Sequence, residues 1–334
     1  MCDRLAWADA CRPAERLRRG GSASHLAPVS QADIANRYGL YLDFLQRNGL
    51  LKSGMGAAAL VTPGNVHNFM TELQTRVRSV TVWNSVYKLR RAAELLAPAL
   101  DFSWLAEIEK DIALVMEPSS KLDRLVLAER LVKAGLTLVT EALEFARDDL
   151  ACARGVRNGL MVALLALRPI RLKKFAAFEL GSTFREVHGR WWIALPSITT
   201  KSRRPDEHAA PAFLTPAILV YLRKARPFLL GSAPPTNALW ISSTTRRQLT
   251  AKNLGTLISR LTLETVGVDV SPHLFRTAAA STSATYGGDT PHLASALLQH
   301  TDPRVTEEHY NRATSMSAAQ EFAALIQAYR VEPK

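Results

Sequence analysis

The chain has 334 residues, 47% of them apolar, which is enough to build two domains that each bury a core. Its formal net charge of +12 favours a polyanionic partner, nucleic acid first and an anionic membrane second. It has no uninterrupted run of about 18 apolar residues and no apolar leader, so neither a bilayer span nor a secretory signal is expected. The cysteines, Cys2, Cys11 and Cys152, are odd in number and scattered, which indicates a reducing cytoplasm.

The first third of the sequence predicts an arm followed by a helical domain. Residues 1–28 are rich in arginine and contain the pair Gly20-Gly21, which is typical of a flexible basic arm. Beyond them, apolar residues recur at helical spacing, with helix starts expected at Ser30 and at Thr62-Pro63, a capping residue followed by a proline. We therefore expect an all-helical domain over residues 29–117.

The remainder, residues 118–334, predicts a second domain that is mainly α with a small antiparallel β-sheet. Val187-His-Gly-Arg190 has the composition of a hairpin turn. Short strands are expected at 178–184, 191–195 and 209–213. Helical periodicity flanks them, at 122–147, 156–167, 215–224, 251–266, 272–286, 291–299, 305–310 and 317–328. The predicted fold class is thus an α+β domain behind a helical bundle.

Basic residues gather in the middle of the second domain. Arg168 ends the apolar run 164–167, and the stretch 168–204 holds nine basic residues against two acidic ones. A solvated basic face and a surface that follows phosphates both explain such a cluster. Lys201, between two expected strands, would by itself be an ordinary solvent-exposed hairpin lysine.

Several residues near the end of the chain could act on a phosphate. His273 and Arg276 lie one helical turn apart behind Ser271-Pro272, which fits an anion-binding helix end as well as a capped helix with two surface polar groups. His300 could simply stabilise a helix C-terminus, and Tyr310 could be a half-buried aromatic. A tyrosine, with a reference pKa of about 10, becomes a nucleophile at neutral pH only with help from nearby cations.

A metal site is the competing use of the histidines His273, His292, His300 and His309. No H-E-x-x-H motif, paired C-x-x-C or carboxylate-rich ligand set accompanies them, and no glycine-rich P-loop is present. We therefore expect neither a metal, nor ATP, nor a small-molecule cofactor.

Six residues resemble, by their type and order, the active-site series of the tyrosine recombinase (phage integrase) family. They are Arg168, Lys201, His273-x-x-Arg276, His300 and Tyr310. The resemblance covers about residues 120–330, while residues 30–116 resemble the core-binding domain of that family in pattern only. It implies a site-specific recombinase that integrates, excises or resolves DNA, for example of a mobile element, without metal or ATP. A homo-tetramer on paired double-stranded sites, in the cytoplasm at the nucleoid, would be the working form.

The resemblance also implies roles for the residues that would hold the scissile phosphate. Arg168 and Arg276 would bind it and stabilise its developing charge. His300 would donate a hydrogen bond to a non-bridging oxygen.

The remaining residues of the series would move protons and attack. Tyr310 would attack the phosphorus to give a 3′-phosphotyrosine, with His273 assisting proton transfer at the tyrosine. Lys201 would protonate the departing 5′ oxygen.

Further basic residues are expected to contact the DNA backbone, and the last helix to contact a partner. The helix over 317–328 would be exchanged between protomers, as is often seen in this family. The expected DNA contacts are Lys88, Arg90, Arg91, Arg171, Lys173, Lys174, Arg203 and Arg204.

The sequence departs from the family in three places. Arg171 stands where an acidic residue usually follows the first arginine, and Gln299 stands in place of a glycine. The interval from His300 to Tyr310 is one residue longer than the commonest spacing. Two alternatives follow, a non-cleaving integrase-like DNA-binding or regulatory protein and a monomeric enzyme like the type IB topoisomerases.

Overall fold

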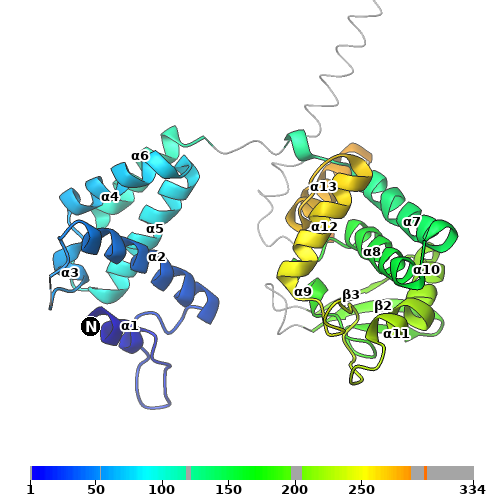
Figure 1. Ribbon diagram of the computed structural model, residues 1–334. Helices are drawn as coiled ribbons and strands as arrows, with labels where there is room; N and C mark the ends of the chain where they lie inside the picture. Colours follow the sequence, from blue (N-terminus) through cyan, green and yellow to red (C-terminus); the bar gives the residue numbers. More distant parts are fainter. Residues whose placement is uncertain (1, 53, 118–121, 197–204, 287–296, 299–334) are drawn as a thin grey trace, which may run out of the picture. The chain divides into compact units, whose positions relative to one another are not determined.

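The computed structural model describes residues 2–52, 54–117, 122–196, 205–286 and 297–298 (Figure 1). The chain folds as two compact units, Met1–Ser120 and Lys121–Lys334, which divide close to the boundary expected between 117 and 118. Together they form a mainly helical protein with a small antiparallel sheet, which confirms the predicted fold class.

The first unit is built around one helix, α5 (Ser79–Leu96), against which the other helices pack. Its apolar residues recur every three or four positions, so Val82, Val86 and Leu89 form one fully buried stripe. The surrounding helices are α1 (Cys2–Ala10), α2 (Pro28–Arg47), α3 (Ala57–Leu60), α4 (Pro63–Arg76) and α6 (Ser103–Val115). The predicted start of α4 is confirmed, because the Thr62 hydroxyl accepts from the Asn65 amide at 3.3 Å and proline follows the cap.

The prediction of a flexible arm is wrong for the residues that the structure describes. Residues 2–10 form α1, and Ala10 and Ala23 are buried in the core of the first unit. The Ser22 hydroxyl donates to the Leu95 carbonyl at 2.7 Å, and the Tyr38 hydroxyl donates to Asp3 at 3.0 Å. The sequence did not predict these contacts, because the segment is rich in arginine and its two buried alanines and one serine form no apolar periodicity.

The second unit is built around α8 (Asp149–Leu167). Residues 159–166 of this helix are all buried, because α7, α10, α11, α12 and α13 pack around it (Figure 1). By length and composition α8 is also apolar enough to cross a membrane, but 61% of it is buried inside the unit, as in the core helix of a folded domain. The other helices are α7 (Ala128–Phe145), α9 (Leu172–Ala176), α10 (Thr215–Val220), the π-helix η4 (Tyr221–Ala225), α11 (Arg226–Leu230), α12 (Ala251–Val266) and α13 (Pro272–Tyr286), with the 3-10 turns η1 (Leu122–Arg124) and η3 (Ala212–Leu214).

Small residues let α7 and α8 approach until their backbones touch. A Cβ added at Gly159 would lie 2.4 Å from the Gly135 carbonyl oxygen, and one at Gly135 would lie 2.6 Å from the Ala163 amide nitrogen. Further along, a Cβ at Gly155 would lie 2.4 Å from the Ala142 side chain. This glycine seam fixes how closely the two helices pack.

A three-stranded antiparallel sheet, in the order β1-β2-β3, completes the second unit. The strands are β1 (Phe184–Val187), β2 (Arg190–Leu195) and β3 (Asp206–Ala209). The predicted hairpin turn is confirmed: Val187 pairs with Arg190, and His188 and Gly189 both have positive φ, as a two-residue hairpin turn requires.

Two of the three strands differ from the expected ranges. Phe178 and Phe184 are buried aromatics that suggested one strand, but Gly181 turns the chain between them with φ of 78°, so β1 begins only at Phe184. The strand expected at 209–213 is instead β3 at Asp206–Ala209, whose polar residues gave no alternating signal.

We expect Gly159→Ala to destabilise the second unit by about 1–3 kcal/mol, because the added methyl group meets backbone atoms that cannot move aside. Gly39→Ala is the control, since a Cβ there meets nothing within 4 Å and alanine favours the helix. Urea unfolding, with hydrogen exchange assigning the transition to α7 and α8, measures both. Equal stability of Gly159→Ala and the parent chain would show that the seam can open freely.

Candidate functional site

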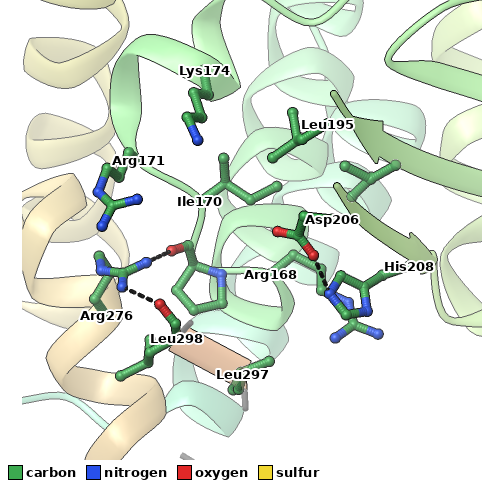
Figure 2. A pocket seen from close by; sticks show the side chains of 12 residues that line it. Arg168, Ile170, Arg171, Lys174, Leu195, Asp206, His208, Arg276, Leu297 and Leu298 are labelled. Atoms are coloured by element: carbon green, nitrogen blue, oxygen red, sulfur yellow. Dashed lines mark hydrogen bonds and ion pairs between the residues drawn. The ribbon is translucent and has the colours of Figure 1, made fainter. Parts of the chain in front are cut away.

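A pocket rich in cations lies in the second unit, where the end of α8, the start of α9, strands β2 and β3, and α13 meet (Figure 2). Its basic lining residues are Arg168, Arg171, Lys174 and Arg276, and its one carboxylate is Asp206. All of these except Asp206 are predicted site residues. The pocket therefore brings together parts of the sequence that were identified separately.

Arg168 enters the pocket because α8 ends there. The residue before a proline is pushed out of the helical region, and Arg168, followed by Pro169, has non-helical backbone angles, φ −133° and ψ 88°. One terminal nitrogen of its guanidinium donates to the Ala209 carbonyl on β3 at 3.4 Å. Burial lowers the pKa of Arg168, and the nearby Asp206 carboxylate opposes that shift. Its Nε is buried and has no hydrogen-bond partner among the described residues.

Arg276, on the second turn of α13, ties three chain segments together. It donates to the Pro169 carbonyl at 2.7 Å and to the Leu298 carbonyl at 2.6 Å (Figure 2). Burial, with a smaller effect from Arg171, lowers the pKa of Arg276 to about 10. The group therefore remains a cation at neutral pH.

Arg171 and Lys174 add two more cations from the start of α9. Arg171 is exposed and Lys174 is half-buried. Burial first, and then Arg171, lowers the pKa of Lys174, while Asp206 raises it and Arg276 lowers it further. These mutual effects mean that four cations share one field with a single carboxylate, an arrangement that attracts an anion.

The other predicted catalytic residues are not brought into this pocket by the described part of the chain. His273 lies in the first turn of α13 and is exposed, one turn before Arg276 and outside the pocket lining. Lys201, His300 and Tyr310 lie outside the described residues, as do Arg203 and Arg204. Their place in the site stays a prediction, as does the helix over 317–328.

The predicted DNA contacts in the first unit are engaged in ion pairs. Arg90 is bound by Glu109 at 2.5 Å and by Glu94 at 2.6 Å, which raises the pKa of Arg90, and its side chain is 19% exposed. The Arg90 guanidinium is therefore held inside the first unit by two carboxylates. Lys88 pairs with Asp33 at 3.1 Å and Arg91 with Glu94 at 3.0 Å, so each would have to exchange a carboxylate for a phosphate.

Lys173, by contrast, is exposed on α9 next to the pocket, where a DNA backbone contact remains a prediction.

Sequence reasoning missed Asp206 and His208. They alternate on β3 and pair in register with Leu195 and Ile193 of β2, so all of them face the pocket. His208 and Asp206 form an ion pair when the imidazole is protonated. The available signal was the spacing Asp-x-His, which places both side chains on one face of any strand.

The described residues contain no group of three or more His, Cys, Asp or Glu side chains that could hold a metal ion. Asp206 and His208 supply only two donors, and four cations surround them. The donor set of the pocket therefore suits an anion better than a metal.

Neither a family model nor a curated protein matches the chain. Among solved structures it is similar to a lambda integrase dimer bound to a COC' core site, with a TM-score of 0.50 and 12% identity over 86% of this chain and 90% of that one. XerH recombinase bound to palindromic difH in a post-cleavage complex has a TM-score of 0.48 and 14% identity, over 95% of this chain and 99% of that one. XerA recombinase has a TM-score of 0.41 and 16% identity, over 90% and 94%.

We expect Arg90→Gln to destabilise the first unit by about 2–4 kcal/mol, because it leaves the buried Glu109 carboxylate without its partner. Arg91→Gln, whose ion pair with Glu94 is more exposed, should cost less than about 1 kcal/mol. Hydrogen exchange of the α5 and α6 amides in the intact chain measures both. A loss no larger for Arg90→Gln than for Arg91→Gln would mean that Glu109 finds another donor.

Proposed function

We propose that this chain, which has the tyrosine recombinase fold, is a site-specific DNA recombinase that cuts and rejoins strands through a 3′-phosphotyrosine. One observation carries the proposal. Arg276 donates to the carbonyl of Pro169, 107 residues earlier in the chain and directly after Arg168. The two arginines of the predicted series thus meet in one pocket, on a fold shared with an integrase.

The chemistry proposed for this pocket begins with phosphate binding. Arg168 and Arg276 bind the non-bridging oxygens of the scissile phosphate with charge-assisted hydrogen bonds. These donors are held by the backbone of β3 and by the 168–170 turn, so little reorganisation is needed as charge develops on the phosphate.

The making and breaking of bonds is assigned to the other residues of the predicted series. The Tyr310 oxygen attacks phosphorus, giving up its proton with assistance from His273, and the bond from phosphorus to the 5′ oxygen breaks. Lys201 gives a proton to that departing oxygen, and His300 donates to a phosphate oxygen. The new ester conserves the energy of the phosphodiester, so attack by a 5′ hydroxyl reverses the step without ATP, metal or another cofactor.

The partner we propose is a double-stranded recombination site, bound by a homo-tetramer in the cytoplasm. The lambda integrase to which the chain is similar was solved on a core site, which supports duplex DNA as the partner. The net charge of +12 and the cations of the pocket fit the same partner. Exchange of the segment 317–328 between protomers would link the active sites.

We expect Tyr310→Phe to bind its DNA site with unchanged affinity but to form no covalent adduct, because only the phenol oxygen is lost. The site is first selected from a random duplex library with the purified chain. A suicide substrate containing a nick near the cleavage point then traps the adduct on a denaturing gel. Tyr286→Phe is the matched control, an exposed tyrosine at the end of α13 that should leave the adduct in place.

An adduct that persists in Tyr310→Phe would move the nucleophile to another residue. Binding without an adduct in the parent chain would favour the non-cleaving DNA-binding alternative. Relaxation of supercoiled DNA by a monomer would favour the topoisomerase-like alternative.

Binding should weaken steeply with salt, because phosphate contacts release counterions. Replacing one phosphate-contacting cation should reduce the slope of log affinity against log salt by about one. We expect this for Arg171→Gln, whose side chain is exposed at the pocket, and not for Arg147→Gln, whose exposed side chain pairs with Asp148 elsewhere. Equal slopes for the two variants would exclude Arg171 from the DNA contact.

A further inference from the structure

The pocket holds a buried donor that lacks a partner. Arg168 Nε has no hydrogen-bond partner among the described residues. An unsatisfied buried polar group costs about 1–3 kcal/mol, so it calls for an explanation. Asp206 Oδ1 lines the same pocket and is also buried, and its close contact among the described residues is the ion pair with His208 Nε2.

Asp206 is placed toward Arg168 by the register of the sheet. It pairs with Leu195 on β2, and its side chain, 14% exposed, turns to the same side as the buried Leu195. Glu207, the next residue, faces the other way and pairs with Arg185 at 3.3 Å on the surface. One strand thus carries one carboxylate inward and one outward.

Arg168 and Asp206 interact electrostatically. The Asp206 carboxylate opposes the effect of burial on the pKa of Arg168 and has the same effect on Lys174. No other carboxylate lines the pocket, and Arg171 on the 168–171 segment is a cation. Figure 2 shows Asp206 and His208 beside the guanidinium of Arg168, while Arg171 lies beside Arg276.

We propose that Asp206 is the positioning residue of this site, the carboxylate on β3 that fixes the orientation of the Arg168 guanidinium for phosphate binding. The Ala209 carbonyl holds one terminal nitrogen of Arg168 at 3.4 Å, and Asp206 supplies the opposite charge that keeps the side chain in the pocket. His208, paired with Asp206, holds that carboxylate in turn. The proposal rests on the proposed function in one respect, that Arg168 binds the phosphate.

A first experiment is independent of DNA cleavage. In the intact chain labelled with nitrogen-15 at arginine, NMR of the Nε–H groups reports how far each guanidinium is restrained, and Arg168→Lys identifies the Arg168 signal. Asp206→Asn should shift this signal and increase the motion of the group, while Asp206→Glu should preserve much of the restraint. Glu207→Gln, with the same charge change on the outward face of β3, should leave the signal where it was.

A second experiment tests the consequence for the reaction. Asp206→Asn should slow formation of the covalent adduct by about 10- to 100-fold, the range for a group that orients another functional group. In an Arg168→Ala background the same change should cost nothing more, because a residue that acts through Arg168 has no effect without it. Thermal unfolding of each variant checks that the fold is retained.

The outcomes separate the two proposals. An unchanged Arg168 signal in Asp206→Asn, or equal rate losses with and without Arg168, overturns the positioning role and leaves the recombinase proposal standing. If the Arg168 signal shifts in Asp206→Asn but the parent chain forms no adduct on its own DNA site, the positioning role is supported and the cleavage proposal is overturned. A non-additive rate loss together with a shifted signal supports both.

Discussion

The contact between the backbones of α7 and α8 is the constraint on which the second unit depends. The glycines of this seam leave no room for a single methyl group, so the position of α8 is set along its whole length. Helices pack around α8, and residues 159–166 of its C-terminal half are all buried. Arg168 directly follows the end of α8, so the packing of this helix sets where the Arg168 backbone lies, while the contacts of the guanidinium set how the side chain is oriented.

The pocket gathers positive charge in a place where charge is costly. Burial lowers the pKa of Arg168, Lys174 and Arg276, and the neighbouring cations add to this at Lys174 and Arg276. Arginine tolerates the cost because its pKa starts so high that it stays charged. The repulsion that remains is relieved when an anion enters, so the same arrangement that weakens the empty site strengthens binding of a phosphate.

The sequence predicted most of this architecture where periodicity was strong. The helices around Val86 and Leu160, the hairpin at His188 and the pocket residues Arg168 and Arg276 all followed from spacing or from a family resemblance. Two misses share a cause, since each involves tertiary contacts that outweigh local composition. Ala23 packs in a stretch dominated by arginine, and Arg90 turns inward to a glutamate 19 residues away. The carboxylate on β3 was missed for a different reason: a short polar strand has no apolar alternation, and the spacing Asp-x-His was the one signal that it offered.

The hydrogen bonds of Arg276 have a consequence for the limits of substitution at that position. A guanidinium spreads its N–H groups over a rigid plane, and here one terminal nitrogen faces the Pro169 carbonyl and the other the Leu298 carbonyl. A guanidinium has five N–H groups, and these two hydrogen bonds use two of them. One side chain can therefore donate to the scaffold and still have N–H groups left for a ligand. A lysine has only three N–H donors, all on one nitrogen, so it could not reach both carbonyls in the same plane and keep as many donors for a ligand.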